Sequence, residues 1–385
     1  MPGVMISCGE PSGDLYAGAL TTALRRQHPG LDVYGFGGPR LADAGGRLLG
    51  SYEGLAVTGL SEVLRTLPRT WRMYRHLIAE AERQRPDVFV AIDFADFNFR
   101  LGQALHKRGI PVVYYIGPQL WAWRPGRMQA IKRFADRVLV IFPFEQALYE
   151  RAGVPVQFVG HPLIDLIDRH APRATILTSH GLSHAARTVA LLPGSRHNEV
   201  ASTLPTMLEA CARLRAEEPD LQFLIARAPG LHDQQFEMAR RSHMPIGVHE
   251  GDTDAVVAAS DLVITASGTA TVQTALHGKP MVIVYRLSPL TYRLGRPFVK
   301  VDTFGMVNLI AGRRVVPELI QDDFTPARVC DEALRFLRDQ AYADSVRAEL
   351  ARVVQALGGP GASDRAATAV LALAATRAST GDAHD

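Results

Sequence analysis

Short runs of consecutive apolar residues alternate along this chain with longer segments in which apolar residues recur at helical spacing. Uninterrupted apolar runs of strand length are typical of parallel strands that are buried on both faces. The predicted strands are residues 4–8, 33–36, 88–92, 112–116, 138–142 and 157–159, followed by 189–192, 222–226, 246–249, 262–265 and 281–285. Because strands and helices alternate in both halves, the pattern predicts an α/β fold with two doubly wound, Rossmann-like sheets.

The length of the chain also indicates two domains, because 385 residues exceed what one ordinary hydrophobic core contains. We expect an N-terminal domain over residues 1–168 and a C-terminal domain over residues 187–340, which face each other across a cleft. The segment 169–186 is rich in His, Ser, Thr and Ala and is the predicted join. Residues 341–376 form a predicted helical tail that packs on the N-terminal domain or on a partner subunit.

Composition narrows the class of protein mainly by exclusion. A hydrophobic content of 47% with 21% charged residues is globular, and a net charge of +3 does not indicate a nucleic-acid partner. Cys8, Cys211 and Cys330 lie far apart in the sequence, which disfavours a disulfide framework or a zinc site and fits a reducing cytosol. We find no signal peptide, no stretch that would span a bilayer as a helix, and no pattern that calls for a cofactor.

Three turns follow predicted strands, at residues 9–14, 193–196 and 266–269. In doubly wound sheets, ligands bind at the carboxyl ends of the strands, where these turns lie. The first turn contains Glu10, Ser12 and Asp14, and its two carboxylates would repel a phosphate but suit hydroxyl groups. The other two turns contain no carboxylate. The pattern therefore predicts a phosphate-bearing donor on the second half and a hydroxylated acceptor on the first.

The donor turns each precede a predicted helix, and backbone N–H groups at a helix start attract phosphate oxygens. Arg196 adds a planar fork that grips two such oxygens. Gln273, one helical turn beyond the third strand-end turn, either bonds a ribose diol or is a solvated helix residue. The predicted donor-binding residues of these two turns are Gly194, Ser195, Arg196, Ser267, Gly268 and Thr269.

An acidic pair at Asp252 and Asp254 resembles metal–diphosphate ligands of some sugar transferases. The commoner interpretation is that Asp252 or Thr253 caps a short helix over residues 255–259. We therefore predict no metal site.

In the first half, Asp93 directly follows a buried strand, where a carboxylate would take a proton from an attacking hydroxyl. His161 is the rival base, although a lone histidine after a strand is more often structural. Asp96 is expected to cap the helix that follows Asp93, and Ser12 or Asp14 to cap the helix over residues 15–27.

Residues 60–83 carry apolar residues at helical spacing with arginines between them, and Pro68 is expected to kink this helix or to start a second one. Either the helix packs on the sheet, or Leu64, Leu67 and Trp71 dip into an anionic lipid surface. Further on, Arg124 in an arginine- and tryptophan-rich segment is placed to meet a phosphate of the acceptor.

Taken together, the motifs resemble the lipid-A-disaccharide synthase family of bacterial GT-B glycosyltransferases, in the right order from about residue 4 to residue 321. The matching segments are residues 9–14, 37–40, 92–98, 121–127, 142–145, 160–163, 192–196, 266–271, 285–292 and 308–313. Gln273 stands where the family usually has glutamate.

The resemblance implies an inverting transfer from UDP-2,3-diacylglucosamine to 2,3-diacylglucosamine 1-phosphate, which forms a β-1,6 linkage and releases UDP. It also implies Asp93 as the base, Arg196 at the diphosphate and Asn308 near the nucleotide-sugar. The expected location is the cytoplasm, peripherally on the inner membrane, with a homodimer possible. The alternatives are a hydrolysing UDP-N-acetylglucosamine epimerase and a non-catalytic nucleotide-sugar-binding module.

Overall fold

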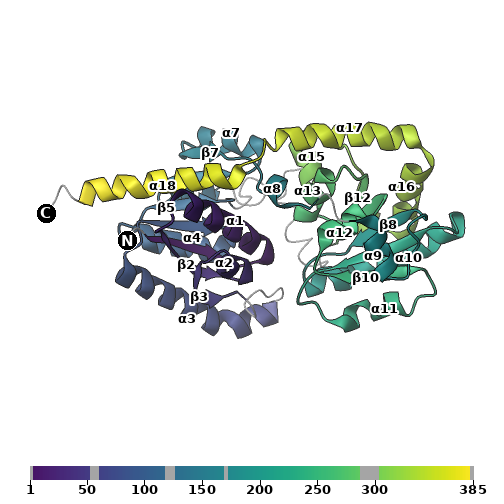
Figure 1. The fold of residues 1–385 in the computed structure, drawn as a ribbon, viewed down its shortest axis with the longest axis horizontal. Helices are drawn as coiled ribbons and strands as arrows, with labels where there is room; N and C mark the ends of the chain where they lie inside the picture. The colour runs from purple at the N-terminus through teal and green to yellow at the C-terminus, as the bar shows by residue number, and fades with distance from the viewer. Residues whose placement is uncertain (1–2, 53–59, 118–125, 169–171, 287–302, 382–385) are drawn as a thin grey trace. The chain divides into compact units, whose positions relative to one another are not determined.

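The computed structural model describes residues 3–52, 60–117, 126–168, 172–286 and 303–381 (Figure 1). The chain divides into two compact units. Unit 1 comprises Met1–Leu166 together with Leu357–Asp385, and unit 2 comprises Ile167–Ala356. Each unit has a parallel sheet covered by helices, as the apolar runs predict.

The sheet of unit 1 has the strand order β3-β2-β1-β4-β5-β6-β7. All the strand pairs that the structure describes in this sheet are parallel. The strands are β1 (Gly3–Cys8), β2 (Asp32–Gly37), β3 (Arg47–Ser51), β4 (Val88–Ile92), β5 (Val112–Tyr115), β6 (Arg137–Val140) and β7 (Val156–Phe158).

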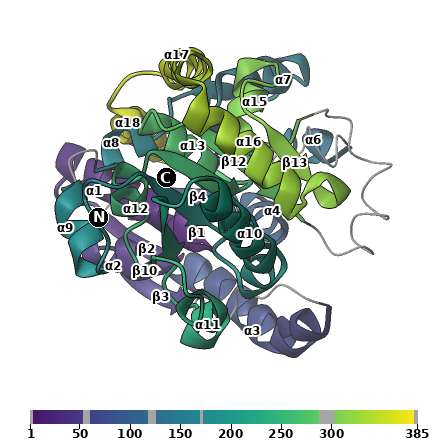
Figure 2. The same ribbon diagram turned by 90° about the vertical axis from the view of Figure 1, so that its right-hand side faces the viewer.

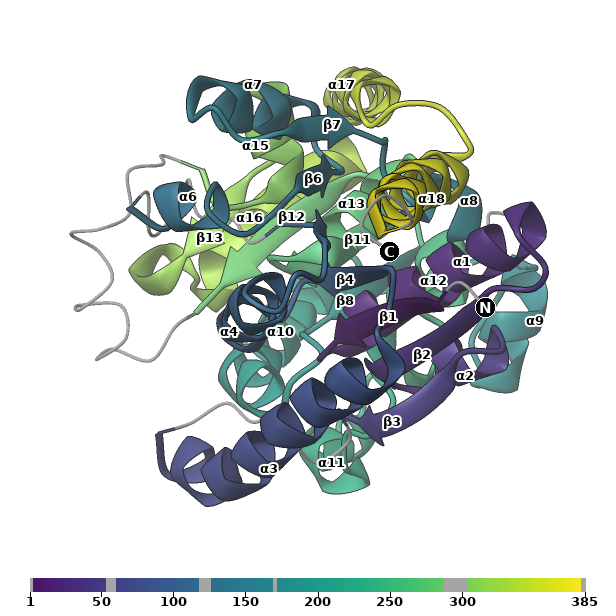
Figure 3. The same cartoon turned by 90° about the vertical axis from the view of Figure 1, so that its left-hand side faces the viewer.

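Helices cover both faces of this sheet, with α1 packed on α18 and α3 packed on α4 (Figure 3). Leu77 and Ala81 of α3 are buried in the core with Phe89 of β4. The helices of unit 1 are α1 (Pro11–Gln27), α2 (Pro39–Asp43), α3 (Leu60–Gln84), α4 (Ala95–His106), α6 (Gly126–Ile131), α7 (Pro143–Arg151), α8 (Leu163–Leu166) and α18 (Ala362–Gly381).

The sheet of unit 2 has the strand order β10-β9-β8-β11-β12-β13. Helix α10 packs on α16, and α13 packs on α15 and α17 (Figure 2). The strands are β8 (Thr188–Leu192), β9 (Gln222–Arg227), β10 (Ile246–Glu250), β11 (Leu262–Ala266), β12 (Met281–Tyr285) and β13 (Glu318–Ile320). The helices are α9 (Arg173–Ser179), α10 (His197–Glu217), α11 (Glu237–Arg240), α12 (Thr253–Ala258), α13 (Thr269–Leu276), α15 (Met306–Ala311), α16 (Pro326–Arg338) and α17 (Gln340–Ala356), with two 3₁₀ turns at Asp233–Phe236 and Gln321–Asp323.

In both sheets the strand order reverses beside the first strand. The reversal lies between β1 and β4 in unit 1, and between β8 and β11 in unit 2. Such switch points are where doubly wound sheets bind ligands, because the two adjoining turns diverge there. All three turns singled out in the sequence follow one of these four strands, as does Asp93.

The strands that the apolar runs predict are all present, with bounds that differ by at most two residues at either end. Two further strands, β3 and β13, are at sheet edges and were not predicted. Strand β3 has no buried residue, and β13 is only three residues long. Edge strands of this kind lack the continuous apolar run of a central strand, so the pattern does not reveal them.

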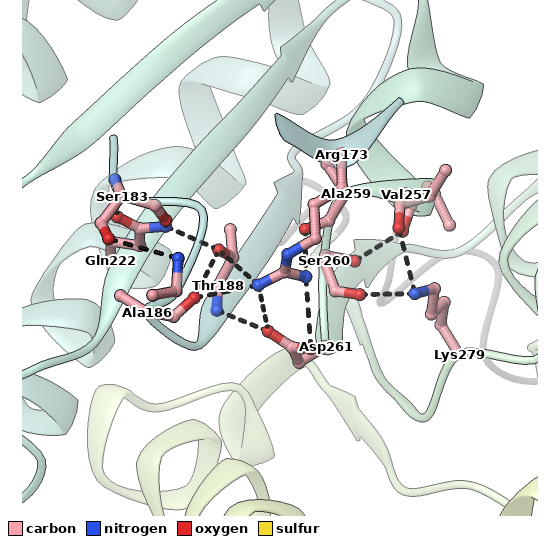
Figure 4. A network of polar contacts seen from close by, with 12 residues as sticks. Arg173, Ser183, Ala186, Thr188, Gln222, Val257, Ala259, Ser260, Asp261 and Lys279 are labelled. Atoms are coloured by element: carbon pink, nitrogen blue, oxygen red, sulfur yellow. Dashed lines mark hydrogen bonds and ion pairs between the residues drawn. The ribbon is translucent and has the colours of Figure 1, made fainter. Parts of the chain in front are cut away.

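The predicted join over residues 169–186 is, where it is described, an integral part of unit 2. The guanidinium of Arg173 donates to both carboxylate oxygens of Asp261, at 3.2 and 2.9 Å, and Asp261 also accepts from the Thr188 amide (Figure 4). The side chain of Gln222 bonds both backbone groups of Ser183. These polar contacts tie the segment to the amino ends of β8, β9 and β11, and a periodicity of apolar residues cannot show them.

The predicted helical tail divides between the two units, since α17 belongs to unit 2 and α18 to unit 1. The chain turns between them at Gly358, whose φ of +90° favours glycine. At the start of α18, the carboxylate of Asp165 accepts from the backbone N–H groups of Gly361 and Ala362. An anion at a helix N-terminus stabilises it, which explains why α18 begins beside α8.

Helix α3 continues through Pro68 as one helix, so a second helix does not start there. Among the described residues, no helix combines the length and the apolar character needed to cross a bilayer.

Candidate functional site

A cavity of about 210 Å³ opens at the carboxyl edge of the unit 1 sheet. Its lining comes from the residues that follow β4, β5 and β6. They are Asp93, Ala95, Ile116, Gly117, Ile141, Phe142 and Glu145. The cavity therefore combines an apolar wall with two carboxylates, one of which is the predicted base.

The backbone beside this cavity is strained. Asp93, Phe94 and Ile116 have φ angles of +46°, +49° and +59°, in the left-handed region that side chains other than glycine rarely adopt. Each such residue costs about 1–3 kcal/mol, and such strain is typical of functional sites. A β-branched residue such as Ile116 is particularly unusual there. The chain thus accepts an energetic cost at the turns that line the cavity.

Asn98 holds the strained turn after β4. Its side chain is fully buried, and its Nδ2 donates to the carbonyls of Ile92, Asp93 and Ser7 at 2.9–3.1 Å. The Ser7 hydroxyl donates to Asn98 Oδ1 at 2.6 Å. One side chain therefore links the ends of β1 and β4 across the switch point. Sequence reasoning missed this role, although an amide in the first turn of a helix after a buried strand was the available signal.

The first predicted turn is mostly helix. We expected Ser12 or Asp14 to cap α1. That prediction is wrong, because the helix begins at Pro11 and Glu10 is its N-cap residue. Proline suits the first helical position, which explains the earlier start. Asp14 is 1% exposed and accepts from the amides of Gly38, Arg40 and Leu41. Its carboxylate therefore serves the N-terminus of α2, while Glu10 and Ser12 are half-buried.

The structure gives His161 a structural environment. It is 1% exposed, packs against Tyr16 and Phe142, and its Nδ1 accepts the Leu163 amide at 3.2 Å. Burial lowers the pKa of His161 to about 3, so the ring is neutral near pH 7. These contacts favour the structural alternative over a role as base.

Asp96 does not cap α4, contrary to the expectation from the sequence. The helix begins at Ala95 with Phe94 as the N-cap residue, and Asp96 is exposed in the first turn. The left-handed conformation of Phe94 starts the helix earlier than the position of Asp96 suggests. An acidic residue there still interacts favourably with the helix N-terminus.

On helix α3, Leu67 and Trp71 are 55% and 56% exposed, while Leu77 and Ala81 are buried. The ring of Trp71 stacks on Tyr74 at 5.3 Å between centroids. Helix α3 therefore packs on the core through Leu77 and Ala81, and it exposes Leu67 and Trp71 nearer its start. Arg124 and the side chain of Leu64 lie outside the described residues.

In unit 2, the turn after β8 contains a feature that the sequence did not reveal. The carboxylate of Glu199, one turn into α10, accepts from the backbone N–H groups of Ser195 and Arg196 at 3.0 and 3.3 Å. Its other oxygen pairs with the Arg196 guanidinium at 3.0 Å. Gly194 has a φ of +122°, and a Cβ there would lie 2.6 Å from the Glu199 carboxylate. An internal carboxylate thus holds the groups that we assigned to a diphosphate.

Tyr285, at the end of β12, lies close to this pair. Burial and the charge of Glu199 raise the pKa of the Tyr285 phenol, whereas Arg196 lowers it. The turn after β11 lies on the strand between β8 and β12. There, Gly268 is the N-cap residue of α13 with a φ of +148°, and Thr269 is the first helical residue. The predicted donor-binding turns therefore lie on adjacent strands of one sheet edge.

Gln273 is half-buried and bonded to the acidic segment before it. Its Nε2 donates to Asp254 Oδ1 at 2.7 Å, and His277 Nε2 lies 2.9 Å from the same oxygen. Asp252 accepts the Ala255 amide as the N-cap of α12, as the commoner interpretation predicted. In the part of the chain that the structure describes, no group of three or more His, Cys, Asp or Glu side chains has the arrangement of a metal site.

Asn308 is fully buried, and both the oxygen and the nitrogen of its side-chain amide form hydrogen bonds. Its Oδ1 accepts from the amides of Val315 and Val316, and its Nδ2 donates to Glu318 and the Val316 carbonyl. Glu318 in turn accepts from Phe304 and Gly305. The Ser267 hydroxyl donates to the Phe304 carbonyl at 3.2 Å. In this structure Asn308 is therefore linked to Ser267 of the predicted donor turn through Glu318 and the backbone of Phe304.

Comparison with known sequences gives a consistent result. Residues 4–373 match the model of the family described as lipid-A-disaccharide synthetase. The lipid-A-disaccharide synthase of Geobacter sulfurreducens is 43% identical over 369 residues, which cover 96% of each chain. The enzyme of the same name from Myxococcus xanthus is 41% identical over 374 residues, or 97% of each chain.

Solved structures support the fold. A Staphylococcus aureus MnaA–UDP complex has a TM-score of 0.68 at 16% identity, and the match covers 94% of each chain. The glycosyltransferase of kitacinnamycin has a TM-score of 0.64 at 18% identity, with coverage of 97% of this chain and 99% of the other. At these identities the matches establish the GT-B fold, which confirms the predicted fold class.

Proposed function

Because this chain belongs to the lipid-A-disaccharide synthase family, we propose that it condenses UDP-2,3-diacylglucosamine with 2,3-diacylglucosamine 1-phosphate. The products are the β-1,6-linked disaccharide 1-phosphate and UDP, and the enzyme is an inverting hexosyltransferase. Apart from family membership, the observation that carries the proposal is the position of Asp93, which follows β4 at the switch point of unit 1 and lines the cavity.

The reaction needs one base on the acceptor side. Asp93 takes the proton of the acceptor 6-hydroxyl as that oxygen bonds to C1 of the donor sugar. The C1–O bond to UDP breaks at the same centre from the opposite face, so the configuration inverts. A positioned general base contributes about 10²–10⁴ in rate. The Asn98 bonds to the Asp93 and Ile92 carbonyls support this role, because they fix the backbone of the turn that carries the base.

The leaving UDP carries two phosphates whose charge has to be met. Arg196 and the backbone N–H groups at the start of α10 bond the Glu199 carboxylate in this structure, and they supply donors for that charge when the diphosphate takes its place. The turn at Ser267, Gly268 and Thr269 offers a second helix start on the adjacent strand. Gln273 is our candidate for the ribose, with its amide nitrogen bonded to Asp254.

Both substrates are lipids, so we also propose that the enzyme works in the cytoplasm while bound peripherally to the inner membrane. Leu67 and Trp71 project from α3 among the exposed arginines Arg69, Arg72 and Arg75. Apolar groups that insert at the interface, together with basic groups that attract anionic lipid, are typical of a helix that lies on a membrane.

The test of the activity is to incubate the purified protein with both lipids in detergent and to identify the product by mass spectrometry. We expect the disaccharide 1-phosphate and equimolar UDP. UDP-N-acetylglucosamine as the sole substrate is the control, because a hydrolysing epimerase would convert it. Turnover of that soluble substrate without disaccharide formation would contradict the proposal.

Membrane binding is tested by sedimentation with vesicles that contain anionic lipid. Replacing Leu67 and Trp71 by Ser should weaken the association about tenfold or more, since each buried apolar side chain contributes about 1.5–3 kcal/mol. Met238→Ser is the matched control, because Met238 is an exposed apolar residue of unit 2, at 47%. Equal losses in both variants would count against α3 as the membrane contact.

A further inference from the structure

We propose that Asp254 is a positioning residue for the donor nucleotide, which orients the amide of Gln273 toward the ribose and strengthens it as a hydrogen-bond acceptor. The inference rests on the proposed function, in which Gln273 is our candidate for the ribose. It deepens that assignment, because it adds the residue through which the amide acquires one orientation. Asp254 and Gln273 lie 19 positions apart in the sequence, on α12 and α13.

The contact is made by one face of α13. Gln273 and His277 are four residues apart, so both side chains lie on the same face of that helix. Gln273 Nε2 donates to Asp254 Oδ1 at 2.7 Å, and His277 Nε2 lies 2.9 Å from the same oxygen. The side chains of His277 and Asp254 are only 3% and 17% exposed. The carboxylate therefore sits between two side chains of α13 and is largely shielded from water.

This carboxylate decides which way the Gln273 amide faces. An ionised carboxylate only accepts hydrogen bonds, so the nitrogen of the amide has to face Asp254. The amide nitrogen and oxygen branch from the same carbon, and fixing Nε2 on the carboxylate therefore directs Oε1 away from it. Gln273 is half-buried, so part of its side chain remains accessible to a ligand. The amide thus presents an acceptor, which suits the hydroxyl donors of a ribose.

Asp254 also changes how strongly Gln273 accepts. Hydrogen bonds that share a group polarise one another, and the effect is larger where water is excluded. A carboxylate at the amide nitrogen raises the negative charge on the amide oxygen. Gln273 therefore accepts from a hydroxyl more strongly than an isolated amide does. Because the amide is already held, less side-chain entropy is lost when the ribose binds.

The residue type at position 273 follows from the same contact. A glutamate there would bring a second carboxylate to hydrogen-bonding distance of Asp254, and two like charges so close in a shielded site repel strongly. Glutamine avoids the repulsion and gains a bond to the charged group. It is therefore the better partner for Asp254 in this chain, although the family usually has glutamate at this position.

A purely structural role for Asp254 would be to tie α12 to α13 through His277. Loss of such a role changes thermal unfolding, but not the ratio of the affinities for UDP and its 2′,3′-dideoxy form, which isolates the ribose hydroxyls. Asp252→Asn is the matched control. Asp252 has the same charge and is the N-cap residue of the same helix, and asparagine caps a helix about as well as aspartate.

The experiment measures both dissociation constants by isothermal calorimetry, without an acceptor. The unmodified protein should bind UDP about tenfold more tightly than the 2′,3′-dideoxy form, the effect of a hydrogen bond to a polarised group. In Asp254→Asn the ratio should fall to about threefold or less, because the amide loses its charged partner and adopts either orientation. Asp252→Asn should keep the ratio of the unmodified protein.

Gln273→Glu tests the contact from the other side. The new carboxylate meets Asp254, so UDP binding should weaken about tenfold, within the range of coupling between residues in contact. Adding Asp254→Asn should restore the affinity to within about threefold of the unmodified protein. The new asparagine donates to the glutamate through its nitrogen and accepts from His277 through its oxygen. A variant that had only lost its fold would not be rescued in this way.

An unchanged ratio in Asp254→Asn would overturn the inference, as would tighter UDP binding in Gln273→Glu or a double variant that binds UDP no better than Gln273→Glu alone. In a Gln273→Ala background, Asp254→Asn should alter UDP affinity less than about twofold. A full effect in that background would show that Asp254 acts without Gln273, which also contradicts the inference.

The outcome is separable from that of the proposed transfer. If the calorimetry follows these expectations but the protein forms no disaccharide, the proposed reaction fails and the role of Asp254 is supported. If the disaccharide forms but the ratio stays unchanged in Asp254→Asn, only this inference fails. An unmodified protein that binds no UDP would overturn the donor site and the role of Asp254 together.

Discussion

The two units have the same strand order but different chemistry at their switch points. In unit 1, the turn after β4 has two side-chain-bearing residues in the left-handed region, Asp93 and Phe94, and the cavity beside it contains two carboxylates. In unit 2, the turns after β8 and β11 obtain their positive φ from Gly194 and Gly268. Arg196 supplies the positive charge at the first of these turns. The same topology therefore carries two different sets of chemical groups at its strand ends.

The difference lies in what each turn must hold. A diphosphate is recognised by backbone N–H groups, and glycine lets a ligand approach the backbone closely. A base has to present a side chain in one orientation, so glycine cannot replace Asp93 even where its backbone is strained. The strain is compensated nearby, by the four hydrogen bonds of Asn98. We therefore propose that unit 2 binds the diphosphate through its backbone and that unit 1 reacts through a side chain.

Among the variants that test this contrast between the two units, Asp93→Asn has the largest expected effect. We expect kcat to fall about 10²–10⁴-fold, the contribution of a general base, while UDP affinity by calorimetry stays within about twofold. Asp87→Asn is the control, since Asp87 precedes the same strand and accepts the Gly3 amide at 2.7 Å. Unchanged turnover would remove Asp93 as the base, and a matching loss of UDP binding would remove the division of tasks.

The next largest effect is expected for Arg196→Ala, which tests the predicted diphosphate site of unit 2. The UDP dissociation constant should rise about 10- to 100-fold, because a charge-assisted hydrogen bond is lost. The control is Arg213→Ala, an exposed arginine further along the same helix. Isothermal calorimetry measures both, and an isotherm for Arg196→Ala like that of the unmodified protein would reject the diphosphate role.

Asn98→Ala tests whether the strained turn needs its support. We expect kcat to fall about tenfold and the free energy of unfolding to fall by about 1–3 kcal/mol, since buried backbone carbonyls lose their donor. KM for UDP-diacylglucosamine should change little. Gln103→Ala on the same helix is the control. A loss of stability with unchanged kcat would mean that Asn98 supports the fold but not the base.

The smallest expected effect is that of Glu199→Gln, and its direction is opposite to that of Arg196→Ala. Removing the internal charge from the predicted diphosphate site should tighten UDP binding about two- to fivefold, the range of a partly exposed ion pair. Glu209→Gln, an exposed position on the same helix, is the control. Weaker binding would instead show that Glu199 positions Arg196 for the ligand.

Much of this protein could be predicted from local patterns. The apolar runs indicate the central strands because a parallel strand is buried along its whole length, and the order of strands and helices then limits the topology. The positions of Asp93, Arg196 and the glycine turns were predictable for the same reason, since a strand end locates them within a residue or two. The family resemblance was equally local, because it rests on short segments in a given order.

Only the tertiary structure determined the contacts between residues that are distant in the sequence. Asp14 caps a helix that begins 25 residues later (39 − 14), Asn98 reaches Ser7, and Glu145 shares a cavity with Asp93. Helix α18 returns to unit 1 after the whole of unit 2. Periodicity and turn chemistry describe neighbours along the chain. The partner of a buried polar group is selected by the folding of the whole unit, since such a group must find a hydrogen bond wherever the sheet places it.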